Sequence, residues 1–269
     1  MLNSPLLSSH DAKSGLSAAE SAKSHWARIR LSEQFYARAL RSIAKQAGKF
    51  IVELWQAGRE NAIQETLKNY ANVLEPWAKS VSEKMLLDVS KRDEQAWMKH
   101  SKRMAAAMQT ELRTMPMSRI VTQLRNEQVA LIKSIPIDAA QRAQNLAFEA
   151  ATQTSARAKT VAQQIMNTTQ VTENRALNIA RTEISRSHAI ILEARSRWIG
   201  SEQYTWHTLL DPQVRKDHRE LEGQVISWNS PPIADKRNGV RAHAGCIYGC
   251  RCFAVPILPA KYQPRNRFE

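Results

Sequence analysis

The sequence predicts a mainly α fold with a small C-terminal α+β module: an elongated helical N-terminal region followed by a short-stranded, loop-rich domain. Residues 17–114 are rich in Ala, Lys, Glu, Gln, Arg and Leu and contain few Gly or Pro. Apolar residues in this region recur at helical spacing. After Gly200 the pattern changes to short β-branched and aromatic segments, separated by Asp-Pro, Pro-Pro and Asn-Gly turns.

A single apolar stripe predicts a long first helix that ends at Gly58. A shorter helix is expected over 61–72, and Pro76 is placed to open the next one. That third helix should extend through Met104 and Leu112 to a break at Met115-Pro116. The stripe of the first helix consists of Tyr36, Leu40, Ile43, Ala47, Phe50 and Leu54.

Two further helices are expected before residue 152. The fourth covers 118–134 and ends before Ile135-Pro136, because proline disfavours a helical residue in front of it. The fifth begins near Asp138. Residues 152–170 are polar and rich in Thr and Gln, which suggests a short helix with flanking loops.

The most regular helical pattern lies between Thr172, a candidate N-cap, and Gly200, a candidate stop. Its apolar seam is narrow, and such a seam suits packing on another helix, either of the same chain or of a partner. Strands are expected at 203–209, 224–228 and 252–257. The seam residues are Leu177, Ala180, Ile184, Ser187, Ile191, Ala194 and Trp198.

The chain is strongly basic, with 39 Lys and Arg against 25 Asp and Glu, a net charge of +14. Such a surface attracts polyanions or acidic protein faces. The charge is spread along the chain, so it fits either a generally basic solvated surface or a nucleic-acid groove. The tryptophans at 26, 55, 77 and 97 fall in amphipathic helices, where aromatic residues are more often core anchors than base-stacking platforms.

The sequence does not begin with the positively charged segment and following apolar segment of a signal peptide. It also contains no run of 18 apolar residues that would predict a transmembrane helix. We therefore expect a protein that is made and kept in the cytoplasm, or packed into a particle assembled there, and that does not enter a membrane. In that reducing compartment, cysteines are more often thiols or metal ligands than disulfides.

All three cysteines fall within residues 243–252, HAGCIYGCRC. On a strand, Cys250 and Cys252 would present both sulfurs to one face, with the arginine between them turned away. With His218 and His243 they make a sufficient tetrahedral set for a structural zinc ion. Cys246 or Asp211 is a possible substitute ligand. Two alternatives remain open: buried thiols beside hydrogen-bonded histidines, and a disulfide from the first cysteine to one of the other two.

Three sequence blocks together resemble the phage head morphogenesis family of Mu protein F and the minor head protein of phage SPP1. They are ALNIARTEISRSHA at 176–189, D-x3-R-x2-H-x2-L-x-G at 211–223, and H-x-G-x4-C-R-C at 243–252. Within the first block, Arg181 and Glu183 lie off the apolar seam. They are expected either to bond the C-terminal module or to form an ordinary solvated pair.

The resemblance implies a non-enzymatic, low-copy virion component that associates with the portal protein during procapsid assembly and assists DNA packaging or ejection. It implies capsid or scaffolding proteins as further partners, and a location inside the capsid near the portal. Non-specific contact with packaged DNA agrees with the charge. The alternative is a metal-dependent nuclease or another DNA-processing enzyme.

The predicted organisation follows from these patterns and from the resemblance. Residues 1–16 are expected to be a flexible N-terminus and 17–135 a helical region. Residues 136–258 would form the Mu F-like domain, with helices over 136–200 and the small β-containing module over 201–258. Residues 259–269 would be a basic tail.

Overall fold

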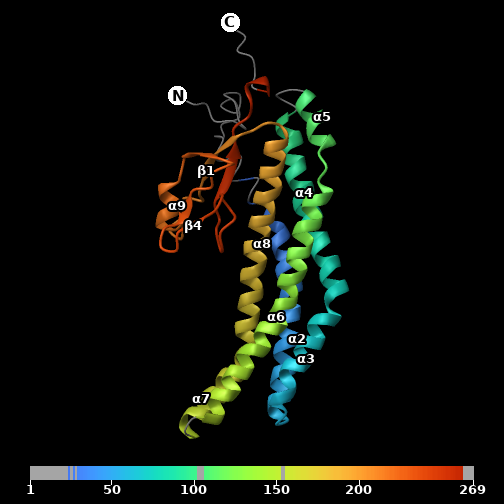
Figure 1. The fold of residues 1–269 in the computed structure, drawn as a ribbon, viewed down its shortest axis with the longest axis vertical. Coiled ribbons are helices and arrows are strands. Elements are labelled where there is room, and N and C mark those ends of the chain that lie inside the picture. The colour runs from blue at the N-terminus through green and yellow to red at the C-terminus, as the bar shows by residue number, and fades with distance from the viewer. Residues whose placement is uncertain (1–23, 25–26, 28, 102–105, 153–154, 263–269) are drawn as a thin grey trace. The chain divides into compact units, whose positions relative to one another are not determined.

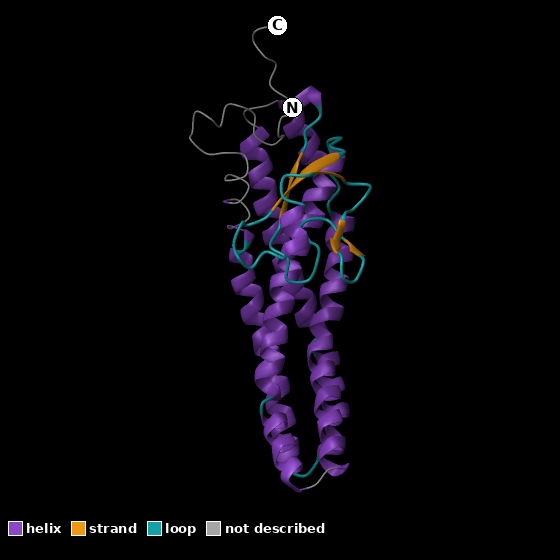
Figure 2. Ribbon diagram, turned by 90° about the vertical axis from the view of Figure 1, so that its left-hand side faces the viewer, coloured by secondary structure: helices purple, strands orange, loops and turns teal. Residues whose placement is uncertain are grey.

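The computed structural model describes residues 24, 27, 29–101, 106–152 and 155–262 of the chain. The predicted flexible N-terminus, Trp26, Met104 and most of the basic tail lie outside these residues. The mainly α prediction with a small α+β module is confirmed, because the strands gather in one region of a largely helical chain (Figure 2). No helix among the described residues is both long enough and apolar enough to cross a membrane.

The helices mostly follow the sequence pattern (Figure 1). The predicted stop at Gly58 is confirmed, since its φ of 66° is one that glycine adopts without strain. The elements before the strands are α2 (Leu31–Gln56), the short 3-10 helix η2 (Glu60–Ala62), α3 (Ile63–Val73), α4 (Glu75–Ser101), α5 (Ala106–Thr114), α6 (Ser118–Thr152), α7 (Ser155–Met166) and α8 (Thr168–Trp198).

The predicted helix break before Pro136 is wrong, because α6 continues through that residue. Proline removes one helical hydrogen bond and costs roughly 3 kcal/mol in a helix interior. Ile132 and Ile135 on one side of it, and Ala139 and Ala140 on the other, are all buried. Burying an isoleucine contributes about 1.5–3 kcal/mol, so packing on both sides of Pro136 is sufficient to offset the lost bond.

The predicted cap at Thr172 is also wrong. Helix α8 already begins at Thr168, and the Thr172 hydroxyl donates a hydrogen bond to the Thr168 carbonyl at 2.8 Å inside the helix. The predicted stop is confirmed: Gly200 has a φ of 82°, and the Ser201 amide donates to the Ser196 carbonyl at 2.8 Å.

The buried face of α8 differs from the predicted seam: it is wider, and Trp198 of the predicted seam is 45% exposed. Several polar residues of the helix are buried beside the apolar ones, among them Glu183, His188 and Arg195. The reason is that the C-terminal half of α8 packs against two neighbours, the strands and the side chains of α4 and α5. One face therefore covers the β-module and another contacts helices.

The chain divides into two compact units. One comprises the described residues within 24–32, 87–120 and 182–262, and the other comprises the described residues within 33–86 and 121–181. The second unit has its own apolar core, which α2, α3, α6 and α7 supply. The core residues are Ala47, Ile51, Ile63, Leu67, Ala139, Ala140, Ala143, Val161 and Ile165.

The first unit contains the strands. Antiparallel pairing gives a three-stranded sheet in the order β2 (Val225–Ser227), β1 (Gln203–His207), β5 (Phe253–Pro256). A hairpin of β3 (Ile233–Asp235) and β4 (Val240–Arg241) stands apart from it. The short helix α9 (Lys216–Glu220) joins β1 to β2, and the 3-10 helix η3 (Ala260–Tyr262) follows β5. Strands were predicted at all three positions of the sheet, whereas α9 and the hairpin were not.

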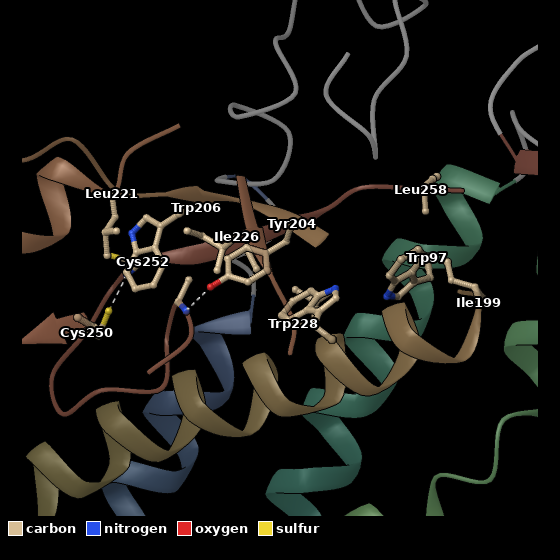
Figure 3. Packing of buried hydrophobic residues seen from close by; sticks show 14 of the residues in the cluster. Trp97, Ile199, Tyr204, Trp206, Leu221, Ile226, Trp228, Cys250, Cys252 and Leu258 are labelled. Carbon is tan, nitrogen blue, oxygen red and sulfur yellow. Dashed lines mark hydrogen bonds between the residues drawn. The ribbon is translucent and has the colours of Figure 1, made fainter. Parts of the chain in front are cut away.

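The core of this unit combines strand and helix side chains. Trp206, Tyr204 and Trp228 from the sheet region share it with Trp97 of α4 and Ile199 after α8 (Figure 3). In Figure 1, β1 and α9 lie beside the C-terminal half of α8. The 201–258 segment therefore does not depend on its own few apolar side chains, because α4, α5 and α8 enlarge its core.

Candidate metal centre

Three residues predicted to bind a metal lie together in the first unit. The Nδ1 atom of His218 lies 3.3 Å from the Sγ atom of Cys252 and 3.6 Å from the Sγ atom of Cys250. Ligand atoms of all three residues lie within 4.8 Å of one another, and all three side chains are buried. Three of the four residues of the predicted set therefore lie within reach of one ion, and metal binding by them stays a prediction.

Helix α9 places His218. The Arg219 guanidinium anchors the preceding loop by donating to the carbonyls of Val214 at 3.0 Å and Pro212 at 2.9 Å. The Lys236 amide donates to the Asp217 carboxylate at 2.9 Å, which fixes the outer side of α9. With the helix held in this way, the His218 ring points into the core and packs edge-on against Trp206 at 5.6 Å between centroids.

A glycine-rich turn before β5 places the two cysteines. Gly249 has a φ of 63°, and its amide donates to the Thr182 hydroxyl of α8 at 3.1 Å. The Cys250 amide donates to the Ile247 carbonyl at 3.0 Å. Residues 250–252 precede the strand itself, but both thiols still point inward, as Figure 3 shows beside Trp206.

Two arginines form polar contacts between the loop of residues 208–215 and this turn. Arg251 pairs with Asp211 at 2.7 Å, and Arg215 donates to the Tyr248 carbonyl at 2.7 Å. Asp211, predicted as a substitute ligand, is thus engaged by a cation. Its neighbour Leu210 is 72% exposed and has a φ of 56°, an unfavourable conformation for leucine.

His243 does not lie with the other three residues. Its Nδ1 faces the Tyr204 hydroxyl at 3.2 Å, and its Nε2 faces the Trp228 carbonyl at 3.1 Å. Both ring nitrogens therefore have partners in the sheet region, which is the hydrogen-bonded role that the sequence left open. Burial lowers the pKa of His243 and raises that of Tyr204, which favours the neutral form of both.

Cys246 also lies outside the cluster. It is half-buried and unpaired, and burial raises its pKa to about 12. The other two cysteines are free as well, so the predicted alternative of a disulfide is absent among the three. A hydrogen bond from the Cys252 thiol lowers the pKa of Cys250, and the same bond raises that of Cys252.

The two charged residues of the ARTE block have separate partners. Arg181 is largely exposed and pairs with Glu33 at 3.1 Å, whereas Glu183 is buried and pairs with Arg186 at 3.2 Å. Neither of these two ion pairs involves a residue of the strands. The hydroxyl of Thr182, which lies between them in sequence, makes the contact with the cysteine turn.

Two histidine–carboxylate pairs were missed by the sequence reasoning. His207 of β1 faces Glu222 at 2.9 Å. Asp93 of α4 lies 2.8 Å from Arg195 and 3.5 Å from His188, and all three side chains are at most 5% exposed. The seven-residue spacing of His188 and Arg195 puts them on one helix face, but nothing in the pattern identified Asp93 as their partner.

The three sequence blocks that suggested a family fall within one compact unit, except for residues 176–181. Residues 144–255 match the family model described as Phage Mu protein F like protein. Over this segment the chain is similar to Mu F-like proteins. The recognition made from the sequence is thereby confirmed for the segment, which runs from the end of α6 to β5.

The chain is similar to an uncharacterized protein of Haemophilus influenzae. It is 35% identical over 130 residues, which are 48% of this chain and 28% of the relative. The chain therefore spans little more than a quarter of that protein's length. No solved structure matches the chain.

Proposed function

We propose that this protein is a minor head protein of a tailed phage, a low-copy virion component that associates with the portal during procapsid assembly. The Mu F-like match over residues 144–255 carries the proposal. Assistance to DNA packaging or ejection, and contact with capsid or scaffolding proteins, belong to the same proposal.

Two properties of the chain agree with a binding role. The surface is basic, with a net charge of +14, and the portal-proximal interior of a head contains packaged DNA, a dense polyanion. In addition, the residues grouped around the buried thiols are one imidazole and two cysteines, without a carboxylate. A hydrolytic metal site commonly adds a carboxylate as general base or ligand.

The test is co-purification of the full-length chain with its cognate portal protein at modest and at high salt. We expect association that persists when salt is raised, because a built interface includes apolar contacts that salt does not screen. No association at modest salt would contradict the proposal. Loss of association at high salt alone would point to non-specific charge attraction, and would also contradict it.

The nuclease alternative is supported by one observation, the His207–Glu222 pair. A histidine oriented by a carboxylate is a common general base. A DNA cleavage assay with added divalent metal ions separates the two functions. Cleavage by the wild type that is lost in a folded His207→Ala or His218→Ala variant would favour the nuclease, and absence of cleavage would favour the head component.

A further inference from the structure

We propose that His218, Cys250 and Cys252 hold one zinc ion through a single imidazole nitrogen and two thiolates, and that a water molecule completes the coordination. His243, Cys246 and Asp211 are not ligands in this proposal. The inference stands on the geometry of the three side chains and is independent of the proposed role in the phage head.

The separations between the donor atoms fit a tetrahedral ion. Zinc–sulfur bonds of about 2.3 Å and zinc–nitrogen bonds of about 2.0–2.1 Å at tetrahedral angles place a nitrogen and a sulfur about 3.5 Å apart. The two observed distances from His218 Nδ1 to the sulfurs, 3.3 and 3.6 Å, lie on either side of that value. A shared ion therefore fits with little movement of the side chains.

Hydrogen bonding alone satisfies this cluster poorly. Nδ1 of a neutral histidine carries either one proton or one lone pair, yet it faces two sulfurs at once. All three side chains are 2–3% exposed, so bulk solvent supplies them with few hydrogen bonds. A metal ion in the centre satisfies the nitrogen and both sulfurs together, and its positive charge neutralises two buried thiolates.

The surroundings also suit ligand sulfurs. The Cys252 amide donates to the Cys250 sulfur at 3.3 Å (Figure 3). Such a bond stabilises the thiolate form and fixes its direction, as outer partners of metal ligands do. Trp206 packs against the ligand imidazole and excludes solvent from it.

Zinc is the ion that this donor set favours. Thiolate ligands select zinc or other soft ions over magnesium and calcium, and a mixed sulfur and nitrogen set of tetrahedral shape is typical of zinc. No other described His, Cys, Asp or Glu belongs to the group. The fourth position therefore falls to a small external donor, for which water is the simplest choice.

The ion would connect α9 to the turn before β5. His218 is 32 residues before Cys250 and 34 residues before Cys252 in the sequence. Because metal binding to a preformed site adds to folding free energy, the ion would stabilise the loop-rich part of the Mu F-like segment.

The test is titration of the reduced, metal-free, full-length protein with Co²⁺, followed by displacement with Zn²⁺. We expect one equivalent of cobalt to produce the visible absorption of a tetrahedral site together with sulfur-to-cobalt charge transfer, and zinc to abolish both. Cys250→Ser and Cys252→Ser should each weaken binding by more than about 100-fold, since loss of even an outer partner weakens metal binding 10–100-fold.

Two matched variants serve as controls. Cys246→Ser removes the third cysteine and His243→Gln removes the other candidate histidine, and both should bind cobalt as the wild type does. Absence of stoichiometric binding by the wild type would overturn the proposal. So would a loss in either control that equals the loss in Cys250→Ser.

A second measurement does not depend on the folding of variants. Native protein is alkylated with and without zinc, and the labelled cysteines are located by mass spectrometry. Zinc should protect Cys250 and Cys252 and leave the labelling of Cys246 unchanged. Equal protection of all three thiols, or of none, would contradict the proposal.

Discussion

At the scale of single residues, the sequence identified the cysteine pair but not the full environment of the histidines. The two-residue spacing of Cys250 and Cys252 predicted that both thiols face one point, although residues 250–252 precede the strand on which that prediction relied. Which histidine joins them depended on α9, a five-residue helix too short to leave a periodic signal. His243 is much closer to the cysteines in sequence than His218 is, but its ring nitrogens face the Tyr204 hydroxyl and the Trp228 carbonyl instead.

The buried ion pair of Asp93 with Arg195 should be essential for stability. Replacing one member of such a pair leaves an uncompensated buried charge and typically costs 3–5 kcal/mol. We therefore expect Asp93→Ala to lower the free energy of unfolding by about 3–5 kcal/mol, measured by urea denaturation. Glu94→Ala is the control, because Glu94 is 48% exposed and 3.9 Å from Arg195. A similar loss in the free energy of unfolding for both variants would contradict a special stabilising role of the Asp93–Arg195 pair.

His243 should make stability depend on pH. Burial lowers the pKa of His243 in the folded protein. As the pH falls, the His243 side chain is therefore protonated more readily in the unfolded chain than in the folded protein. The free energy of unfolding should therefore decrease below about pH 6.5, the ordinary pKa of histidine. In metal-free protein, the decrease between pH 7.5 and 5.5 should be smaller for His243→Gln than for the wild type. Equal decreases would show that His243 does not contribute.

At the scale of elements, the sequence predicted most helices and all three strands of the sheet, because their apolar residues repeat at regular intervals. It failed where tertiary packing outweighed a local signal. Pro136 lies inside α6 because buried residues on both sides hold the helix, and Thr172 lies inside α8 because that helix starts four residues earlier. The β3–β4 hairpin was missed because strands of two or three residues carry too few positions for a pattern.

Gly48 allows α2 and α8 to approach closely within the second unit. A Cβ atom at this position would lie 2.8 Å from the Thr169 Cα and still closer to its side chain. Gly48→Ala should therefore destabilise the protein by about 1–3 kcal/mol through overpacking, although alanine normally favours helices. Thermal unfolding tests this, with the exposed position Lys45→Ala as control. A stability equal to or above the wild type would contradict the close approach.

At the scale of the whole molecule, the predicted domain boundary between residues 135 and 136 stays a prediction. The compact units show instead that a helical segment far from the strands in sequence belongs with them. Residues 87–120 belong to the same unit as the strands, because Trp97, Met108 and Leu112 share their core. Sequence reasoning could not find this, since the periodicity of a helix indicates which face is buried but not which partner covers it.

The two separate cores predict that metal removal acts on one unit only. Treatment of the zinc-loaded protein with a chelator should increase hydrogen exchange in peptides from 203–256 and leave those from 33–86 unchanged. The reason is that the ligands all lie in the first unit. Exchange that rises equally in both units would mean that the chelator unfolds the whole chain, which contradicts a local brace.

Association with DNA should behave as a charge effect at this scale. With a net charge of +14, the protein should bind double-stranded DNA without sequence preference. The logarithm of the association constant should fall linearly with the logarithm of the salt concentration. Fluorescence anisotropy over a salt series measures this slope. Binding that is independent of salt would instead indicate a specific site.

The most direct test of the account is X-ray absorption at the zinc edge of the full-length, zinc-loaded protein. We expect two sulfur neighbours at about 2.3 Å and two lighter neighbours, the His218 nitrogen and a water oxygen, at about 2.0–2.1 Å. A spectrum with no sulfur neighbours, or with three, would contradict it.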